Sequence, residues 1–146
     1  MFDFPIEDAP GLLRTAREDA GVTQAELARR AGTTQSVVSA IESGRRTPSA
    51  ALLERLLRAA ALRPSVPLER YSDAVVAAAR SRRLDDVHVF GSVASGSDDE
   101  NSDVDLVVTP EPGTGLFALL AFAAEVERIL GFPVDVLTDT EARAAG

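Results

Sequence analysis

Apolar residues in the first half of the chain recur every three or four positions, which is the spacing of helices that bury one face. The first predicted helix covers residues 12–20 and ends at Gly21. Three more begin after Thr23, Thr34 and Ser49, which are residue types that favour a helix N-cap. Four short helices joined by brief turns predict an all-α bundle.

In the second half the apolar spacing shortens to every other residue, which is the period of a strand. Pro64 and Pro67 halt the last helix of the bundle and make residues 63–67 the best linker. We therefore predict an α+β protein of two domains, an all-α bundle over 1–64 and a small mixed β-sheet with flanking helices over 65–146. The predicted elements of the second domain are helices over 68–83 and 115–130 and strands over 87–90, 104–109 and 134–138.

The two predicted domains differ in charge. Residues 1–64 hold nine Arg and eight Asp or Glu, a net charge of +1. Residues 65–146 hold six Arg and fifteen Asp or Glu, a net charge of −9, which accounts for the −8 of the whole chain. Because affinity for nucleic acid depends on neutralising phosphates, so acidic a chain is not a general nucleic-acid coat. The near-neutral first domain still leaves room for a small basic face.

Composition excludes several kinds of protein. At 45% hydrophobic and 26% charged residues, the chain is globular rather than disordered. It has no Cys and one His, which excludes disulfides, thiolate zinc sites, a Cys nucleophile and a multi-histidine metal site. Its longest apolar run, 116–124, is too short to cross a bilayer, and its N-terminus is acidic where a signal peptide needs a basic start. We expect a cytoplasmic protein with no membrane partner, in which Phe2 and Phe4 pack against the helical bundle.

Residues 21–49 contain two capped helices separated by a glycine turn. Thr23 and Glu26 have the spacing of a capping box at the start of the first helix. The second begins after Thr34 and is followed by Gly44 and then by Arg45 and Arg46. Over residues 12–62 these features resemble the Xre / lambda-repressor-like helix-turn-helix family.

This resemblance implies that the helix after Thr34 enters the major groove of double-stranded DNA, while the preceding helix crosses the backbone. Gln35 and Ser36 then face base edges, where a Gln side chain can pair with adenine. Gln24 and Arg45 contact phosphate. The DNA-binding candidates are Gln24, Thr34, Gln35, Ser36, Ser39, Arg45 and Arg46.

The same resemblance makes two structural predictions. Arg17 and Glu42 are expected to form a partly buried ion pair between the first helix and the recognition helix. Paired DNA half-sites favour two-fold symmetry and hence a homodimer. The alternative to DNA binding is a helical interaction module that keeps this fold without reading DNA.

A glycine–serine turn and two spaced carboxylates stand between the first two predicted strands. Gly91 and Ser92 follow one strand, and Asp103 and Asp105 open the next. Residues i and i+2 of a strand point to one face about 6–7 Å apart, so both carboxylates can converge on a divalent cation such as Mg²⁺. Gly91 lets the main chain approach a phosphate, and Ser92 starts a short helix with free N–H groups. The acidic residues at 98–100 fit a solvated turn.

This order of strand, glycine turn and spaced carboxylates resembles the minimal nucleotidyltransferase (MNT) family of the DNA polymerase beta superfamily over residues 68–138. The resemblance implies a nucleotidyltransferase fold that binds ATP at Gly91 and Ser92. It also implies that Asp135, on the next strand, is the third carboxylate, either a second-metal ligand or the base for the attacking hydroxyl. The implied catalytic and Mg²⁺-binding residues are Asp103, Asp105 and Asp135.

Two features depart from the family pattern. Ser95 stands where members commonly have an Arg that offsets triphosphate charge. The candidates to replace that charge are Arg80, Arg82 and Arg83. The sequence ends soon after the third predicted strand, so we expect a pocket that is open or completed by a partner. His88 alternates with apolar strand residues and is interpreted as a surface or packing residue.

MNT proteins similar to this one are typically antitoxins encoded beside a HEPN-type ribonuclease toxin. The resemblance implies transfer of AMP from ATP to a tyrosine hydroxyl of that toxin, and the fused DNA-binding domain implies repression of the chain's own operon. Two other functions stay open. One is a transcriptional regulator whose MNT domain senses nucleotide with weak catalysis, and the other is a nucleotidyltransferase that modifies an antibiotic or another small molecule.

Overall fold

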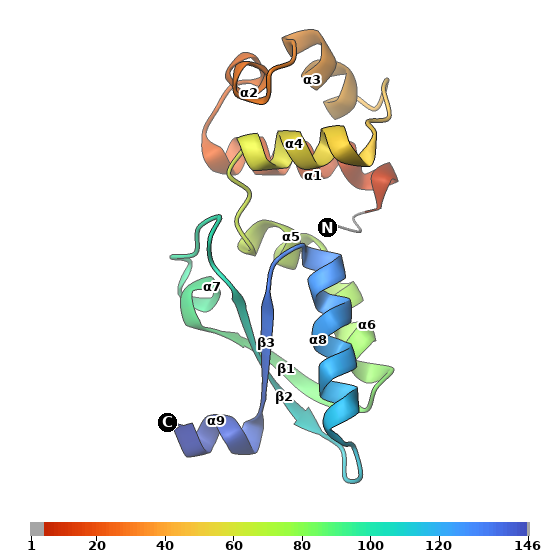
Figure 1. The fold of residues 1–146 in the computed structure, drawn as a ribbon, viewed down its shortest axis with the longest axis vertical. Helices are drawn as coiled ribbons and strands as arrows, with labels where there is room; N and C mark the ends of the chain where they lie inside the picture. The colour runs from red at the N-terminus through yellow and green to blue at the C-terminus, as the bar shows by residue number, and fades with distance from the viewer. Residues whose placement is uncertain (1–4, 146) are drawn as a thin grey trace.

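The structure of the protein, a computed structural model, describes residues 5–145. The prediction for Phe2 and Phe4 therefore lies outside the described residues. A helical bundle and a sheet with its own helices are stacked along the long axis of the molecule (Figure 1). Among the described residues, no helix has the length and hydropathy needed to cross a bilayer.

The first part of the chain folds as the four helices that the apolar spacing predicts. Thr23, Thr34 and Ser49 are N-caps, because each hydroxyl accepts a hydrogen bond from the backbone N–H three residues later, at 3.1, 3.3 and 3.1 Å. The first two helices end at Gly21 and Gly32, which adopt left-handed backbone angles. The elements are η1 (Ile6–Asp8), α1 (Ala9–Ala20), α2 (Gln24–Ala31), α3 (Gln35–Glu42) and α4 (Ala50–Ala59).

The second part departs from the predicted pattern at its start. The helix predicted over 68–83 is two helices, because Tyr71 leaves helical geometry at φ −113° and ψ 22° and its hydroxyl donates to Asp8 Oδ2 at 2.7 Å. Pro64 and Pro67 are buried, so the predicted linker is folded rather than open. The elements are α5 (Ser65–Arg70), α6 (Ser72–Arg80), β1 (Leu84–Phe90), α7 (Gly91–Ser95), β2 (Val104–Pro110), α8 (Leu116–Leu130), β3 (Val134–Thr138) and α9 (Asp139–Ala145), the last of which the sequence analysis does not predict.

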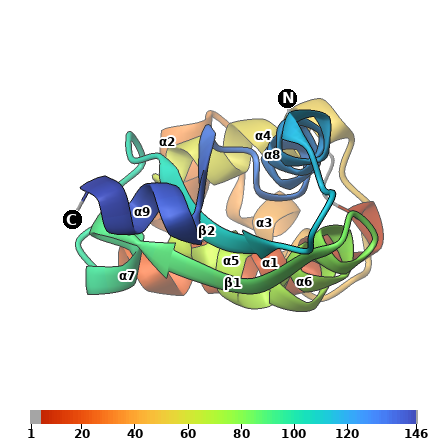
Figure 2. The same ribbon diagram turned by 90° about the horizontal axis from the view of Figure 1, so that it is seen from below.

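The strands form a mixed sheet in the order β1-β2-β3, antiparallel between β1 and β2 and parallel between β2 and β3. α6 and α8 lie on one side of the strands, and α7 and α9 lie on the other (Figure 1 and Figure 2). Val104, Leu106 and Val108 are buried in the apolar core, so the alternate residues Asp105 and Val107 face the opposite side. The predicted fold class, a helical domain followed by a small mixed sheet with flanking helices, is confirmed.

Candidate functional site

The carboxylates of Asp103, Asp105 and Asp135 lie at one end of the sheet, on the face away from α6 and α8. In the strand register, Phe90 of β1 pairs with Asp105 of β2, which pairs with Asp135 of β3. Neighbouring strands lie about 4.8 Å apart and paired residues point to one face, so the Asp105 and Asp135 side chains are neighbours. Asp103 directly precedes β2, two residues from Asp105. The alternation in the sequence predicted a shared face for Asp103 and Asp105, and the strand register adds Asp135 as the neighbour of Asp105.

Gly91 forms a corner directly against the Asp105 carboxylate. Its φ of +73° lies in the left-handed region that side chains rarely adopt. A Cβ on Gly91 would also lie only 2.6 Å from Asp105 Oδ2. Both the backbone angle and the space therefore require glycine here. The chain continues from this corner into the five-residue helix α7, with Ser92 as its second residue.

Asp105 is the carboxylate of this corner whose pKa is raised. Burial raises the pKa of the Asp105 carboxyl, and the negative charges of Asp135 and Asp103 raise it further. Burial is the larger cause, and the two neighbouring carboxylates add to it. A divalent cation bound there would stabilise the ionised form of Asp105.

The chemistry of these donors fits Mg²⁺. Within residues 5–145 no group of three or more His, Asp or Glu side chains is arranged to hold a metal ion. Mg²⁺ does not require such a group, because it is commonly bound by one or two carboxylates together with substrate phosphates and waters. Asp105 beside Asp135 and Asp103 supplies suitable oxygen atoms. The corner therefore fits a cation that arrives with a nucleotide better than a closed resident metal site.

The arginines expected to replace the missing charge at Ser95 do not reach the corner. Arg82 pairs with Glu125 of α8 on the opposite side of the sheet. Arg80 and Arg83 flank the start of β1, whereas the Gly91 corner follows its end, and seven strand residues span about 20 Å. The expectation for Arg80, Arg82 and Arg83 was wrong, because β1 separates two of them from the corner and the third binds Glu125. Ser95 itself donates to the Ser92 carbonyl at 3.1 Å.

The prediction that Asp98 lies in a solvated turn was wrong. Asp98 is 6% exposed, and its carboxylate accepts hydrogen bonds from the Ser65 backbone N–H at 2.8 Å and the Ser65 hydroxyl at 2.6 Å. Arg63 Nη1 donates to the same carboxylate at 2.8 Å. These partners stand more than thirty residues earlier in the chain. No local signal in the sequence could have found them.

His88 shares the face of the sheet that carries the carboxylates. It pairs with Val107, one alternation away from the Phe90–Asp105 pair. His88 is exposed, and Phe90 beside it is 36% exposed. The prediction that His88 faces away from its apolar neighbours agrees with this placement. The sequence signal for this position was the spacing of two residues between His88 and Phe90, because residues two apart on a strand share a face.

The predicted DNA-contacting residues other than Gln24, which begins α2, lie on or beside α3. Thr34 caps the helix, Gln35 and Ser36 are exposed in its first turn, and Arg46 is exposed after its end. Arg45 Nε donates to the Ser43 hydroxyl at 2.9 Å, which holds the guanidinium beside the helix. A surface hollow of about 300 Å³ is lined by Gln35, Ser36, Ser39 and Arg45.

Glu42, the last residue of α3, joins this helix to α1 and α2. Arg17 donates to its carboxylate through Nε at 2.8 Å and Nη2 at 2.9 Å, so the predicted ion pair is confirmed. Gln24, a predicted phosphate contact, donates to the same carboxylate at 3.2 Å. Burial acts to raise the pKa of Glu42, but the hydrogen bonds and charges of Arg17, with Gln24 and Arg14, outweigh it and lower that pKa.

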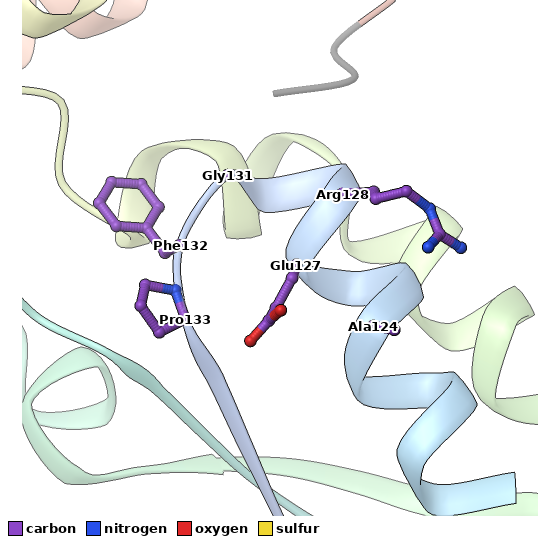
Figure 3. Close-up of a pocket in the computed structure, with 6 residues that line it drawn as sticks. All are labelled: Ala124, Glu127, Arg128, Gly131, Phe132 and Pro133. Atoms are coloured by element: carbon purple, nitrogen blue, oxygen red, sulfur yellow. The ribbon is translucent and has the colours of Figure 1, made fainter. Parts of the chain in front are cut away.

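A second hollow, of about 410 Å³, lies where α8 turns into β3 (Figure 3). Glu127 points into this turn, and its Oε1 accepts a hydrogen bond from the Val134 backbone N–H at 3.0 Å. This contact holds the first residue of β3 and therefore the position of Asp135 directly after it. The hollow is lined by Ala124, Glu127, Arg128, Gly131, Phe132 and Pro133, none of which is a predicted site residue.

Two known families match different parts of the chain. Residues 13–65 match a helix-turn-helix family, and residues 73–145, half of the chain, match the nucleotidyltransferase domain family. The predicted domain boundary after residue 64 stays a prediction.

Two curated relatives match shorter parts of the chain. An HTH-type transcriptional regulator of Methanothermobacter thermautotrophicus is 46% identical over 48 residues, which cover 33% of this chain and 70% of that relative. A Methanocaldococcus jannaschii protein named "Putative protein adenylyltransferase" is 42% identical over 50 residues, which cover 34% of this chain and about half, 54%, of that relative. No solved structure matches the chain. The chain thus belongs to the nucleotidyltransferase domain family and carries an Xre-type helix-turn-helix domain ahead of the transferase domain.

Proposed function

We propose that this chain is a DNA-binding, Mg²⁺-dependent protein adenylyltransferase. The observation that carries the proposal is the contact between the Gly91 corner and the Asp105 carboxylate, with Asp135 as its neighbour on β3. The name of the adenylyltransferase relative supports the choice of AMP as the transferred group. The helix-turn-helix match supports the assignment of DNA binding to the first domain, which we take as residues 1–64, with the transferase domain as 65–146.

In this proposal the triphosphate of ATP lies against the backbone of Gly91 and Ser92, where no side chain obstructs it. Asp103, Asp105 and Asp135 would supply carboxylate oxygens to Mg²⁺ that arrives with the nucleotide, and the ion would neutralise negative charge on the phosphates. A tyrosine hydroxyl of the substrate protein forms a bond to the α-phosphorus, and the bond to the bridging oxygen of pyrophosphate breaks. Asp135 accepts the phenol proton, and pyrophosphate leaves.

The exposure of the corner suits a protein substrate. Gly91, Asp103 and Asp135 are exposed, and Phe90 and His88 extend the same open face along β1. A tyrosine on the surface of another protein can approach such a face without entering an enclosed pocket. We propose that the substrate is a HEPN-type toxin, as the family resemblance implies, and that the chain acts as its antitoxin and represses their shared operon through α3.

The test is transfer of label from α-labelled ATP to the product of the neighbouring gene, in the presence of Mg²⁺. The expected result is a labelled partner that retains one AMP on a tyrosine, and loss of labelling in the double variant Asp103→Ala with Asp105→Ala. Glu100→Ala, an exposed acidic residue of the same loop, is the matched control and should label like the parent. Equal labelling by the parent and the double variant would overturn the catalytic assignment.

A further inference from the structure

Arg63 joins the two domains by binding a carboxylate of each. Its Nη1 donates to Asp98 Oδ1 at 2.8 Å, in the loop between the Gly91 corner and β2. Its Nε and Nη2 donate to the two oxygens of Asp19, both at 2.9 Å, in the last turn of α1. Two-point binding of this kind fixes the orientation of a guanidinium as well as its position. Arg63 therefore links the loop of the transferase domain directly to α1.

The loop end of this bridge is buried and fully bonded. The Asp98 side chain has no exposed surface, and it receives hydrogen bonds from Ser65 and Arg63. Burial acts to raise the pKa of Asp98, but the Ser65 hydrogen bonds and the Arg63 charge outweigh it and lower that pKa. A buried, ionised carboxylate of this kind is costly to leave without its partners. The loop cannot move away without breaking these bonds or carrying Arg63 along.

The other end of the bridge leads to the recognition helix. Asp19 stands two residues after Arg17 on α1, and Arg17 binds Glu42, the last residue of α3. Polar contacts therefore run from the loop through Arg63 to α1, and from α1 to α3. The helix between them is continuous, so a shift of Asp19 moves the groups that hold α3.

A nucleotide at the corner would act on this bridge through charge and through the loop. The triphosphate brings several negative charges to Gly91 and Ser92, at the start of the segment that contains Asp98. Ser97 N–H donates to the Ser92 carbonyl at 2.9 Å, so the corner and the turn before Asp98 move together. Arg63 is shared between Asp98 and Asp19, and added negative charge on the loop side changes how strongly it holds each one.

We propose that nucleotide binding at the Gly91 corner changes the affinity of the chain for DNA, and that Arg63 transmits this change. The protein would then be a DNA reader that responds to nucleotide, and Asp98 and Asp19 would be its positioning residues. This inference rests on the nucleotide binding of the proposed function but not on the transfer of AMP. An ATP analogue with a methylene group between the α- and β-phosphorus atoms separates the two, because AMP cannot be transferred from it.

A second contact between the domains provides a matched control. Arg70 Nη2 donates to Asp8 Oδ1 at 2.7 Å, which joins α5 to the residue before α1. Like Arg63, which binds Asp98, Arg70 is a partly exposed arginine that binds an aspartate of the other domain. Unlike Arg63, it has no bond to the loop between the corner and β2. Loss of Arg70 weakens the contact between the domains at the start of α1 and leaves the bonds of Arg63 to Asp98 and Asp19 in place.

The experiment measures binding of the duplex immediately upstream of the chain's own gene by fluorescence anisotropy, with Mg²⁺ and with or without the methylene analogue. The parent is expected to change its Kd for DNA by about 5-fold or more when the analogue is present, which is the lower range of allosteric coupling. Arg63→Ala and Asp98→Asn are expected to lose this change, and Arg70→Ala to keep it. Asp19→Asn breaks only the α1 side and tests the route if Arg63→Ala does not fold.

Calorimetric titration of the analogue into each protein separates the outcomes. If the parent binds the analogue and its DNA affinity stays constant, the coupling is wrong while the proposed transfer stands. If the parent binds no analogue, the proposed function fails and this inference fails with it. If Arg63→Ala responds to the analogue as the parent does, the route through Arg63 is wrong. In the parent, DNA must also change the analogue's Kd by the same factor, since coupling is reciprocal.

Discussion

The two domains hold their central carboxylates in opposite ways. Glu42 of the DNA-reading domain is buried, but Arg17 and Gln24 bond it and its pKa is lowered. Asp105 of the transferase domain is half-buried among Asp103 and Asp135, and its pKa is raised. Among the described residues no arginine pairs with Asp105. The ionised form is favoured at Glu42 by its bonded partners, and it is disfavoured at Asp105 by burial and by the neighbouring carboxylates.

The largest effect on stability is expected from breaking the ion pair between Arg17 and Glu42. Glu42→Ala leaves Arg17 partly buried without its partner and should cost about 3–5 kcal/mol of unfolding free energy. Thermal unfolding followed by circular dichroism should show a midpoint lowered by on the order of 10 °C. Glu54→Ala removes the exposed pair with Arg58 and should lower the midpoint by less than about 2 °C. A Glu42→Ala melting curve that overlays the parent would show that the pair contributes nothing.

The largest effect on activity outside the carboxylates is expected at the corner. Gly91→Ala adds a methyl group 2.6 Å from Asp105 Oδ2 at a φ of +73°. We expect AMP transfer to fall by about 100-fold, because the displaced backbone no longer meets the phosphates. Gly113→Ala has a similarly positive φ with open space around it and separates backbone strain from the clash. Equal losses in the two variants would contradict the role of the corner.

The pH dependence of stability should have opposite signs at Glu42, whose pKa is lowered, and at Asp105, whose pKa is raised. The pKa of Glu42 is lowered below its ordinary 4.5, so its stabilisation is complete above pH 4.5 and is lost as pH falls through the folded value. In urea titrations between pH 5 and pH 3, the stability difference between the parent and Glu42→Gln should shrink as pH falls. A difference that stays constant over this range would contradict the charge-based role of Glu42.

The smallest expected effect is a gain in stability when the charge of Asp105 is removed. The raised pKa of Asp105 means that its ionised form is destabilised in the folded protein at neutral pH. Asp105→Asn should therefore raise the melting midpoint without metal, by on the order of 1–3 °C. Added Mg²⁺ and nucleotide should stabilise the parent and not the variant. Asp73→Asn, an exposed carboxylate of α6, is the control and should leave the midpoint unchanged.

Features that depend on neighbouring residues were predictable from the sequence. The N-caps Thr23 and Thr34 act through bonds three residues away, and the two-residue alternation of β2 places Asp105 opposite its buried neighbours. The register of β3 against β2 then brings Asp135 beside Asp105, as the resemblance implies. Local geometry and a known motif were sufficient for these parts of the site.

Features that depend on contacts between distant segments were not predictable. Asp98 is buried because Arg63 and Ser65 fold back onto it. Arg82 turns away from the corner toward α8, and Tyr71 breaks a helix where it bonds Asp8. Each of these depends on how two elements pack, which no spacing along the chain records. The contacts between the domains are of this kind.

We propose above that the Gly91 corner and the Asp105 carboxylate bind a nucleotide together with Mg²⁺. The most direct measurement is a crystal structure of the full chain grown with Mg²⁺ and the methylene analogue of ATP. We expect the triphosphate to lie against the backbone of Gly91 and Ser92. We also expect a metal ion bound by Asp105 and at least one of its two neighbouring carboxylates. A nucleotide bound elsewhere, or an empty corner in crystals at saturating analogue, would contradict it.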